Sequence, residues 1–106
     1  MNTVNELTED NLKEIVESNS KVVVQYGASW CGACKIMKPK LKKAAEANDD
    51  ITFIYADAEN FLESRSLTVI QNLPTFVGFV NGEVIAKEVG SKVDNLNNLV
   101  DEVANH

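Results

Sequence analysis

Cysteine and histidine are scarce in this 106-residue sequence, which limits the disulfide frameworks and metal centres that it can build. It has two cysteines, Cys31 and Cys34, and one histidine, His106. Small secreted domains normally use four or more cysteines at wider spacing, because closing a short loop removes little entropy from the unfolded chain. Zinc sites usually have four ligands. We therefore expect neither a structural disulfide framework nor a metal site.

The sequence also lacks a long apolar run and an excess of positive charge. No stretch approaches the roughly 20 apolar residues of a membrane span. An export signal needs basic and then apolar residues, whereas the first twenty residues contain Glu6, Glu9, Asp10 and Glu14. The formal net charge of −6 disfavours binding to phosphate backbones and anionic lipids. We expect a cytoplasmic protein that binds neither nucleic acid nor membrane.

No internal repeat, low-complexity segment or flexible linker divides the chain. The hydrophobic fraction is 44% and the charged fraction 25%, which is typical of a globular protein that folds by itself. The length is common for one domain. The sequence therefore predicts a single domain over residues 1–106, and we expect it to act as a monomer.

The first half of the chain predicts a helix, a strand and a second helix. Thr8 is the expected cap of the first helix. Residues 21–26 are rich in valine and predict a central strand that is covered on both faces. From about Gly32, apolar residues recur at helical spacing until residues 48–50, with a kink expected at Pro39. The expected buried stripes are Leu12, Ile15 and Val16 in the first helix, and Ile36, Met37, Leu41, Ala44 and Ala45 in the second.

The second half predicts a strand, a short helix, a hairpin and a last helix. Residues 51–55 form the strand and residues 59–67 the short helix, which gives a parallel strand–helix–strand unit. Residues 75–80 and 83–86 flank Asn81-Gly82, a strong signal for an antiparallel hairpin because both turn positions need positive φ. The sum is an α/β fold with a mixed sheet. The last helix has the apolar positions Val93, Leu96, Val100 and Val103.

Two residues separate Cys31 from Cys34 at the predicted start of the second helix. Thiol–disulfide exchange needs one thiolate that attacks a disulfide and a second thiol that resolves the mixed disulfide. Cys31 would lie at the helix N-terminus, where unpaired N–H groups and the helix dipole stabilise a thiolate. We therefore expect Cys31 to be the exposed nucleophile and Cys34 the shielded resolving thiol. The alternative, two cysteines that are merely buried apolar residues, fits the loop over residues 27–32 less well.

Lysines follow the cysteine pair. Lys35 is close enough to favour ionisation of Cys31, whereas Lys38 and Lys40 are expected to face solvent. Asp57, at the end of a predicted strand, is expected to cap the following helix and is left out of catalysis.

The segment Tyr26-Gly27-Ala28-Ser29-Trp30-Cys31-Gly32-Ala33-Cys34-Lys35 resembles the active-site segment of the thioredoxin family. The family pattern is usually an aromatic residue, Trp, Ala, any residue, Trp, Cys, Gly, Pro, Cys, Lys. Leu73-Pro74-Thr75 is similar to the family's cis-proline loop, and Gly90 to a glycine after its last strand. The resemblance implies a thioredoxin fold, with a mixed sheet flanked by helices on both faces. It also implies a thiol–disulfide oxidoreductase that reduces protein disulfides.

The resemblance further implies a substrate surface and a set of partners. A cis bond before Pro74 would turn the backbone of Leu73 towards Cys31, where its N–H and C=O would bind an extended substrate segment as a strand. The partners would be disulfide-containing protein substrates and a thioredoxin-reductase-type electron donor. No cofactor would be bound, because this donor would restore the dithiol after each substrate disulfide is reduced. The residues implied to line the surface are Trp30, Gly32, Ala33, Leu73, Pro74 and Gly90.

Three departures from the family pattern bear on mechanism. Gln25 stands where thioredoxins usually keep a buried aspartate, and we place Phe53 at the position of its lysine partner. An amide cannot accept the proton of Cys34, so resolution of the mixed disulfide should be slower. The missing carboxylate charge should also make the reduction potential of the cysteine pair more oxidising. Ala33 replaces the usual proline and pushes the potential in the same direction.

Other interpretations stay open. Gln25 and Ala33 could be tolerated drift rather than specialisation. An oxidase or isomerase activity fits the oxidising shift but not the missing export signal. A redox-independent protein-binding subunit would use the same apolar surface.

Overall fold

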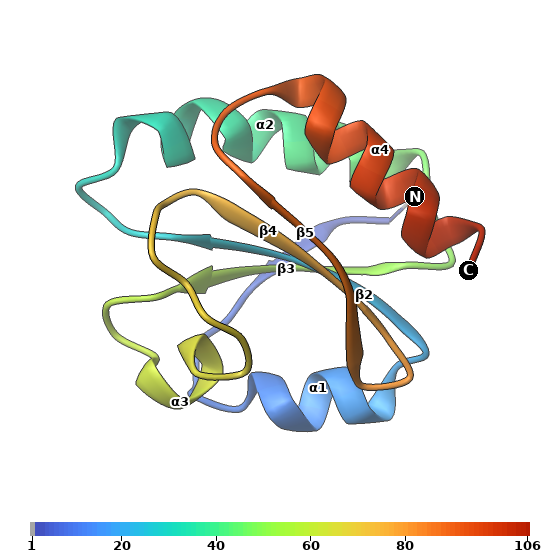
Figure 1. Ribbon diagram of the computed structural model, residues 1–106, viewed down its shortest axis with the longest axis horizontal. Coiled ribbons are helices and arrows are strands. Elements are labelled where there is room, and N and C mark those ends of the chain that lie inside the picture. Colours follow the sequence, from blue (N-terminus) through green and yellow to red (C-terminus); the bar gives the residue numbers. More distant parts are fainter. Residues whose placement is uncertain (1) are drawn as a thin grey trace.

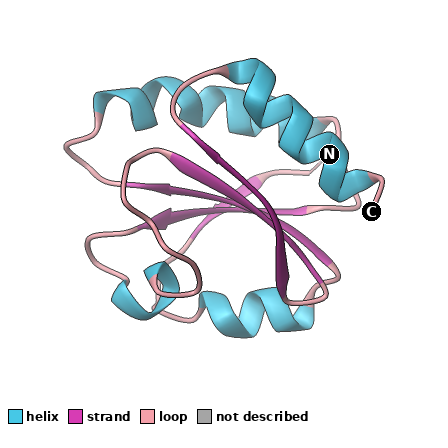
Figure 2. Cartoon of the chain, viewed as in Figure 1, coloured by secondary structure: helices cyan, strands magenta, loops and turns pink. Residues whose placement is uncertain are grey.

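The computed structural model, which describes residues 2–106, contains one mixed sheet with the strand order β1-β3-β2-β4-β5 (Figures 1 and 2). Strands β1 and β2 both run parallel to β3, whereas β4 runs antiparallel to β2 and to β5. The strands are β1 (Val4–Glu6), β2 (Lys21–Gly27), β3 (Thr52–Asp57), β4 (Thr75–Val80) and β5 (Glu83–Val89).

Helices cover both faces of the sheet. Figure 1 shows α2 and α4 together on one face and α1 and α3 on the other. The mixed sheet with helices on both faces, which the resemblance implied, is therefore confirmed. The helices are α1 (Leu12–Ser18), α2 (Gly32–Glu46), α3 (Leu62–Arg65) and α4 (Val93–Ala104). Among residues 2–106, no helix has the length and apolar character needed to cross a membrane.

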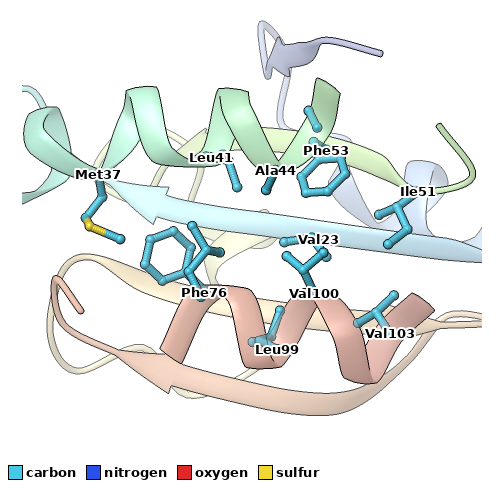
Figure 3. Packing of buried hydrophobic residues seen from close by; sticks show 12 residues of the cluster. Val23, Met37, Leu41, Ala44, Ile51, Phe53, Phe76, Leu99, Val100 and Val103 are labelled. Carbon is cyan, nitrogen blue, oxygen red and sulfur yellow. The ribbon is translucent and has the colours of Figure 1, made fainter. Parts of the chain in front are cut away.

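Strand β2 lies in the middle of the sheet, as expected, and its residues from Val22 to Gly27 are buried. Because side chains alternate along a strand, Val23 packs in the core on the α2 and α4 side, while Val22 and Val24 pack with α1 on the other side. Figure 3 shows the first of these cores, where Leu41 of α2 and Val100 of α4 lie over Phe53 and Phe76. The two cores fix β2 between two helical layers.

The helical spacing of apolar residues predicted burial wrongly at some positions. Ile36 is 66% exposed, although it was expected in the buried stripe of α2. The stripe instead consists of Cys34, Met37, Leu41, Ala44 and Ala45, and Ile36 lies off this face of the helix. Val93, the first residue of α4, is also exposed, and Ile15 is half-buried. Pro39 lies inside α2 and does not end it.

The predicted cap of the first helix was wrong. Helix α1 begins at Leu12, four positions after Thr8, and Asn11 at the N-cap makes no side-chain capping bond. The Asp10 carboxylate instead accepts hydrogen bonds from the backbone N–H of Glu63 and of Ser64 and from the Ser64 hydroxyl. Ser64 Oγ in turn accepts from the N–H of Leu12. Asp10 and Ser64 thus join the starts of α1 and α3.

The Asn81-Gly82 hairpin is confirmed, with φ of 53° and 83° at its two turn residues. Strand β5 is longer than expected and reaches Val89. The helix expected over residues 59–67 is only the four-residue α3. The three-residue strand β1 was not expected, because it is too short for an alternating pattern.

Candidate active site

Cys31 and Cys34 form a disulfide at the N-terminus of α2, with their Cα atoms 5.3 Å apart. Strand β2 ends at Gly27, and the N–H of Cys31 donates to the carbonyl of Ala28 across the loop between them. Cys31 is the N-cap of α2, and its Sγ accepts a hydrogen bond of 3.1 Å from the N–H of Cys34. One sulfur therefore lies among the unpaired N–H groups of the first helical turn, as the sequence predicts.

The two cysteines differ in exposure, but less than expected. Cys31 is 5% exposed and Cys34 is fully buried. Cys34 is thus shielded, as predicted, whereas Cys31 is not the openly exposed residue that its place in a loop suggested. The reason is the packing of Ala28 and Leu73 against the disulfide. Only a small part of Cys31 reaches the surface in this oxidised form.

The loop before β4 lies against the disulfide. The peptide bond between Leu73 and Pro74 is cis, as the resemblance implied. Thr75 Oγ1 donates to the carbonyl of Asn72 at 2.6 Å, and the N–H of Gly90 donates to the carbonyl of Pro74 at 2.9 Å. Gly90 has a φ of 105°, which favours glycine. Leu73 thus packs beside the cysteines, and Pro74, which follows it, is hydrogen-bonded to Gly90.

Trp30 lies at the surface beside Cys31 and is 68% exposed, which rules out a role as core filler. Its Nε1 donates to Glu59 Oε1 at 2.7 Å. Nothing in the sequence indicated this contact of Glu59. Asp57 forms the turn that carries Glu59, because its carboxylate accepts from the N–H of Glu59 and of Asn60. Asp57 therefore does not cap α3, which begins only at Leu62.

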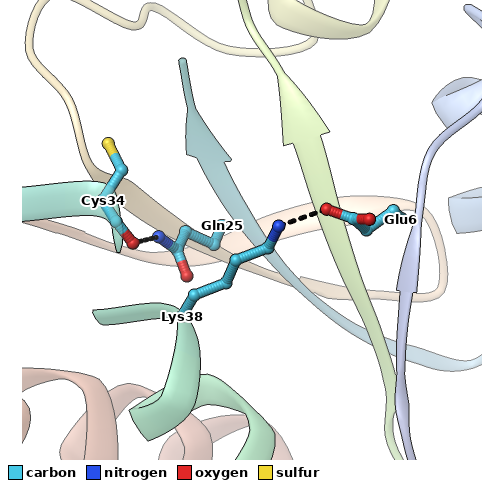
Figure 4. A network of polar contacts seen from close by, with 4 residues as sticks. All are labelled: Glu6, Gln25, Cys34 and Lys38. Atoms are coloured by element: carbon cyan, nitrogen blue, oxygen red, sulfur yellow. Dashed lines mark hydrogen bonds and ion pairs between the residues drawn. The ribbon is translucent and has the colours of Figure 1, made fainter. Parts of the chain in front are cut away.

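Gln25 lies buried in β2 beneath Cys34 (Figure 4). Its Nε2 donates to the backbone carbonyl of Cys34 at 3.0 Å. Only the amide nitrogen can donate to a carbonyl, so this bond fixes the orientation of the side chain. Its Oε1 is the one buried side-chain polar atom within residues 2–106 that has no hydrogen-bond partner. The residue under the disulfide is thus neutral, as expected from the sequence.

The residue of β3 that pairs with Gln25 is Tyr55, and Phe53 lies two positions away along that strand. The parallel register pairs Gln25 with Tyr55, and it pairs Val23 with Phe53. Phe53 is fully buried in the core shown in Figure 3. Strand register decides which residues are neighbours, and the sequence does not reveal it.

Tyr55 occupies space beside the active-site loop. A Cβ on Gly27 would lie 2.8 Å from Cζ of Tyr55, so the tyrosine requires glycine at the position where the family pattern has tryptophan. The ammonium of Lys38 lies 4.3 Å from the centre of the Tyr55 ring and forms an ion pair with Glu6 (Figure 4). Burial raises the pKa of Tyr55. The sequence did not indicate this cluster, because its members come from three elements.

Lys35 is exposed and lines a hollow together with Ala28 and Ser29, whereas Lys40 faces solvent as expected. Gly32 is exposed and Ala33 half-buried, next to the disulfide in α2.

Within residues 2–106 there is no group of three or more His, Cys, Asp or Glu side chains arranged to hold a metal ion.

Comparison with known proteins agrees with this arrangement. The family model "Thioredoxin" matches residues 3–103. The thioredoxin of Mycoplasmoides gallisepticum is 35% identical over 79 residues, which are 74% of this chain and 79% of the relative. Thioredoxin H2 of Arabidopsis thaliana is 31% identical over 88% of this chain and 70% of its own length. The crystal structure of Malassezia sympodialis thioredoxin superposes with a TM-score of 0.90 at 27% identity, covering 98% of this chain and 93% of that one. With its Cys31–Cys34 pair, the chain belongs to the thioredoxin family and is a thiol–disulfide oxidoreductase of the protein-disulfide-reductase type.

Proposed function

We propose that Cys31 is the attacking sulfur and Cys34 the resolving sulfur in the reduction of protein disulfides. The observation that carries the assignment is the position of Cys31 at the N-cap of α2, with its Sγ accepting from the N–H of Cys34. Hydrogen bonding and the helix dipole stabilise a thiolate there after reduction. Cys34 is fully buried and Cys31 is not, so a substrate sulfur can reach only Cys31.

The proposed cycle transfers two electrons from the cysteine pair to the substrate disulfide. The Cys31 thiolate attacks one sulfur of the substrate disulfide, forms a mixed disulfide and releases the first substrate thiolate. Cys34, as a thiolate, then attacks Cys31 Sγ, which restores the Cys31–Cys34 disulfide and releases the second substrate thiolate. Two electrons and two protons from an external donor convert the disulfide back to the dithiol. Thioredoxins need no bound cofactor for this chemistry.

The substrate surface proposed here surrounds the small exposed part of Cys31. Leu73 packs against the cysteines and precedes β4, which supports pairing of its backbone N–H and C=O with an extended substrate segment. Trp30 adds an exposed aromatic face on the other side of the loop. The complete proposed set is Trp30, Gly32, Ala33, Leu73, Pro74 and Gly90.

Gln25 and Lys35 are proposed to modulate the reaction without touching substrate sulfur. Gln25 is neutral and donates to Cys34, so it cannot take the proton that the Cys34 thiol loses, and water must do so. Lys35 follows Cys34 directly and adds positive charge at the helix start. Resolution of the mixed disulfide is therefore slower than it would be with a carboxylate at position 25.

Thioredoxins act with reductases on disulfide substrates. For this chain we propose a single domain over residues 1–106, a monomer, with a flavoprotein thioredoxin reductase as electron donor. The proposed compartment is the cytoplasm, because both cysteines belong to the redox pair and a dithiol carrier works where thiols are kept reduced. Gel filtration with light scattering tests the monomer, and cell fractionation tests the compartment.

The activity is tested by insulin reduction coupled to a thioredoxin reductase and NADPH. The wild-type protein should consume NADPH with insulin, and Cys31→Ser should be inactive. Cys34→Ser should accumulate a mixed disulfide at Cys31, which mass spectrometry of the trapped complex detects. Trapping through residue 34 in the Cys31→Ser variant, rather than through residue 31, would contradict the assignment of roles.

A further inference from the structure

Positive charge is concentrated on one helix of an otherwise acidic protein. Helix α2 carries five of the ten basic residues and a single acidic one. This helix of charge +4 therefore belongs to a chain of charge −6, whose other residues together carry −10. Such an asymmetry orients the molecule in the field of a charged partner. The positive side begins at the disulfide, because α2 starts there.

Two adjoining hollows follow α2 away from the disulfide. One, of about 420 Å³, includes Ala28 and Ser29 of the active-site loop. The other, of about 600 Å³, extends along the helix to Lys42. Both include Glu6 of the edge strand β1 together with Lys35 and Lys38, so the two hollows share these three lining residues. We call them together the α2–β1 groove.

The acidic groups of the groove already have partners, whereas two of its lysines do not. Glu6 forms its ion pair with Lys38, as Figure 4 shows. The Asp57 carboxylate accepts two backbone N–H bonds and a bond from the Asn60 side chain. Within residues 2–106 the Lys38–Glu6 pair is the only ion pair, so Lys35 and Lys42 have none. The unmatched charge in the groove is therefore positive.

The three lysines lie on one side of α2. Their spacing of three and four residues aligns Lys35, Lys38 and Lys42 along the helix. The Lys38–Glu6 pair thus lies between two unpaired ammonium groups, one next to Cys34 and one further along the groove. A segment with two carboxylates, a few residues apart, matches this pattern of charge.

We propose that the α2–β1 groove binds an acidic segment of the disulfide-containing protein substrate, with its carboxylates held by Lys35 and Lys42. This inference rests on the proposed function and names the class of substrate. Because Lys35 directly follows Cys34, a segment held there lies beside the disulfide that it presents to Cys31. A long polyanion fits poorly, because beyond the groove it meets the −10 charge of the remaining chain.

The test compares two synthetic disulfide peptides of equal length, one with two glutamates beside the cystine and one with glutamines in their place. The kcat/KM for each is measured with wild type and with Lys42→Glu, Lys42→Ala and Lys13→Glu. Lys13 is exposed on α1, on the opposite face of the sheet, so its reversal changes the net charge as much as Lys42→Glu does.

Wild type should prefer the acidic peptide. Lys42→Glu should lower the acidic-to-neutral ratio about three- to tenfold, a range set by the strength of exposed ion pairs and local field effects. Lys42→Ala should lower it less. Lys13→Glu should leave the ratio and the activity on the neutral peptide unchanged. High salt should bring the wild-type ratio towards one.

Each contrary result has a distinct meaning. A wild-type ratio of one, with the neutral peptide still reduced, overturns the groove and leaves the proposed function intact. An equal fall of the ratio in Lys13→Glu and Lys42→Glu also overturns it, because net charge then explains the preference. Failure to reduce either peptide contradicts the proposed function itself.

Discussion

Gln25 is the residue with the largest predicted effect on the disulfide. It is fully buried, neutral and bonded through Nε2 to the carbonyl of Cys34. A carboxylate in this place would repel a thiolate on either cysteine and so disfavour the reduced form. The neutral amide does not, and the reduced form is more stable relative to the disulfide. The expected consequence is an oxidising potential.

We predict that Gln25→Asp makes the reduction potential more negative by about 30 mV, which corresponds to a tenfold change in the redox equilibrium constant. The measurement is a redox titration against glutathione at pH 8, with the oxidised fraction read by thiol alkylation. Gln25→Leu is the control, because it removes the bond to Cys34 but keeps the site neutral. If both variants shift the potential equally, loss of the hydrogen bond rather than charge is responsible.

The same substitution should speed resolution, because a carboxylate can take the Cys34 proton. The appropriate companion change is Tyr55→Lys, since Tyr55 and not Phe53 is the neighbour of Gln25 in the register. Single-turnover rates of the double variant should exceed those of wild type from pH 6 to pH 9. Rates that stay unchanged over this range would argue that Gln25 does not limit the step.

Tyr26 acts on stability and lies on the other side of β2. Its hydroxyl donates to the carbonyl of Ser64 at 2.8 Å, and burial raises its pKa well above the usual range. Tyr26→Phe should lower the free energy of unfolding by about 1 kcal/mol, the net value of a typical hydrogen bond. Urea titration measures this loss. Insulin reduction should be unaffected, and a loss of activity without a loss of stability would contradict the assignment.

At the scale of elements, the junction of α1 and α3 depends on one exposed carboxylate. Hydrogen bonds lower the pKa of Asp10. The bond from the Ser64 hydroxyl has the largest effect, and the bonds from the backbone N–H groups of Glu63 and Ser64 add to it. A carboxyl group whose pKa is lower in the folded state stabilises the fold above its unfolded pKa of about 3.9. That stabilisation is lost as the pH falls through the folded value.

Asp10→Asn should therefore lower the melting temperature at pH 7, and the difference from wild type should shrink as the pH falls below about 4. Thermal melts from pH 7 to pH 2.5 measure it. Glu9→Gln is the matched control, since Glu9 is an exposed neighbour outside this network. A difference that stays constant over the whole pH range would show that the charge of Asp10 contributes nothing.

The same elements show what the sequence could reveal. The valine run of β2 and the Asn81-Gly82 turn are local signals, and the structure confirms both. Asp10 binds the N–H groups of Glu63 and Ser64 at the start of α3, which is far away in the chain, so the local sequence around Thr8 does not reveal this contact. The neighbour of Gln25 depends on strand register, and the burial of Cys31 depends on Leu73 from another loop. Long-range partners therefore account for these errors at the site.

At the scale of the whole molecule, the disulfide and the fold share one thermodynamic cycle. The cycle has four steps: reduction of the folded protein, unfolding of the oxidised form, unfolding of the reduced form, and reduction of the unfolded chain. In the unfolded chain residue 25 does not affect the cysteines, because it is no longer held beneath them. Any change in potential caused by Gln25→Asp must therefore appear as a difference in stability between the two redox forms.

Gln25→Asp should destabilise the reduced form more than the oxidised form, by about 1.4 kcal/mol if the potential falls by about 30 mV. Urea unfolding of each form at pH 8, with and without dithiothreitol, measures the two losses separately. Gln25→Leu should destabilise both forms about equally, because it removes the Cys34 bond from both without adding charge. Equal losses in the aspartate variant, together with a shifted potential, would break the cycle and require that residue 25 also acts on the cysteines in the unfolded chain.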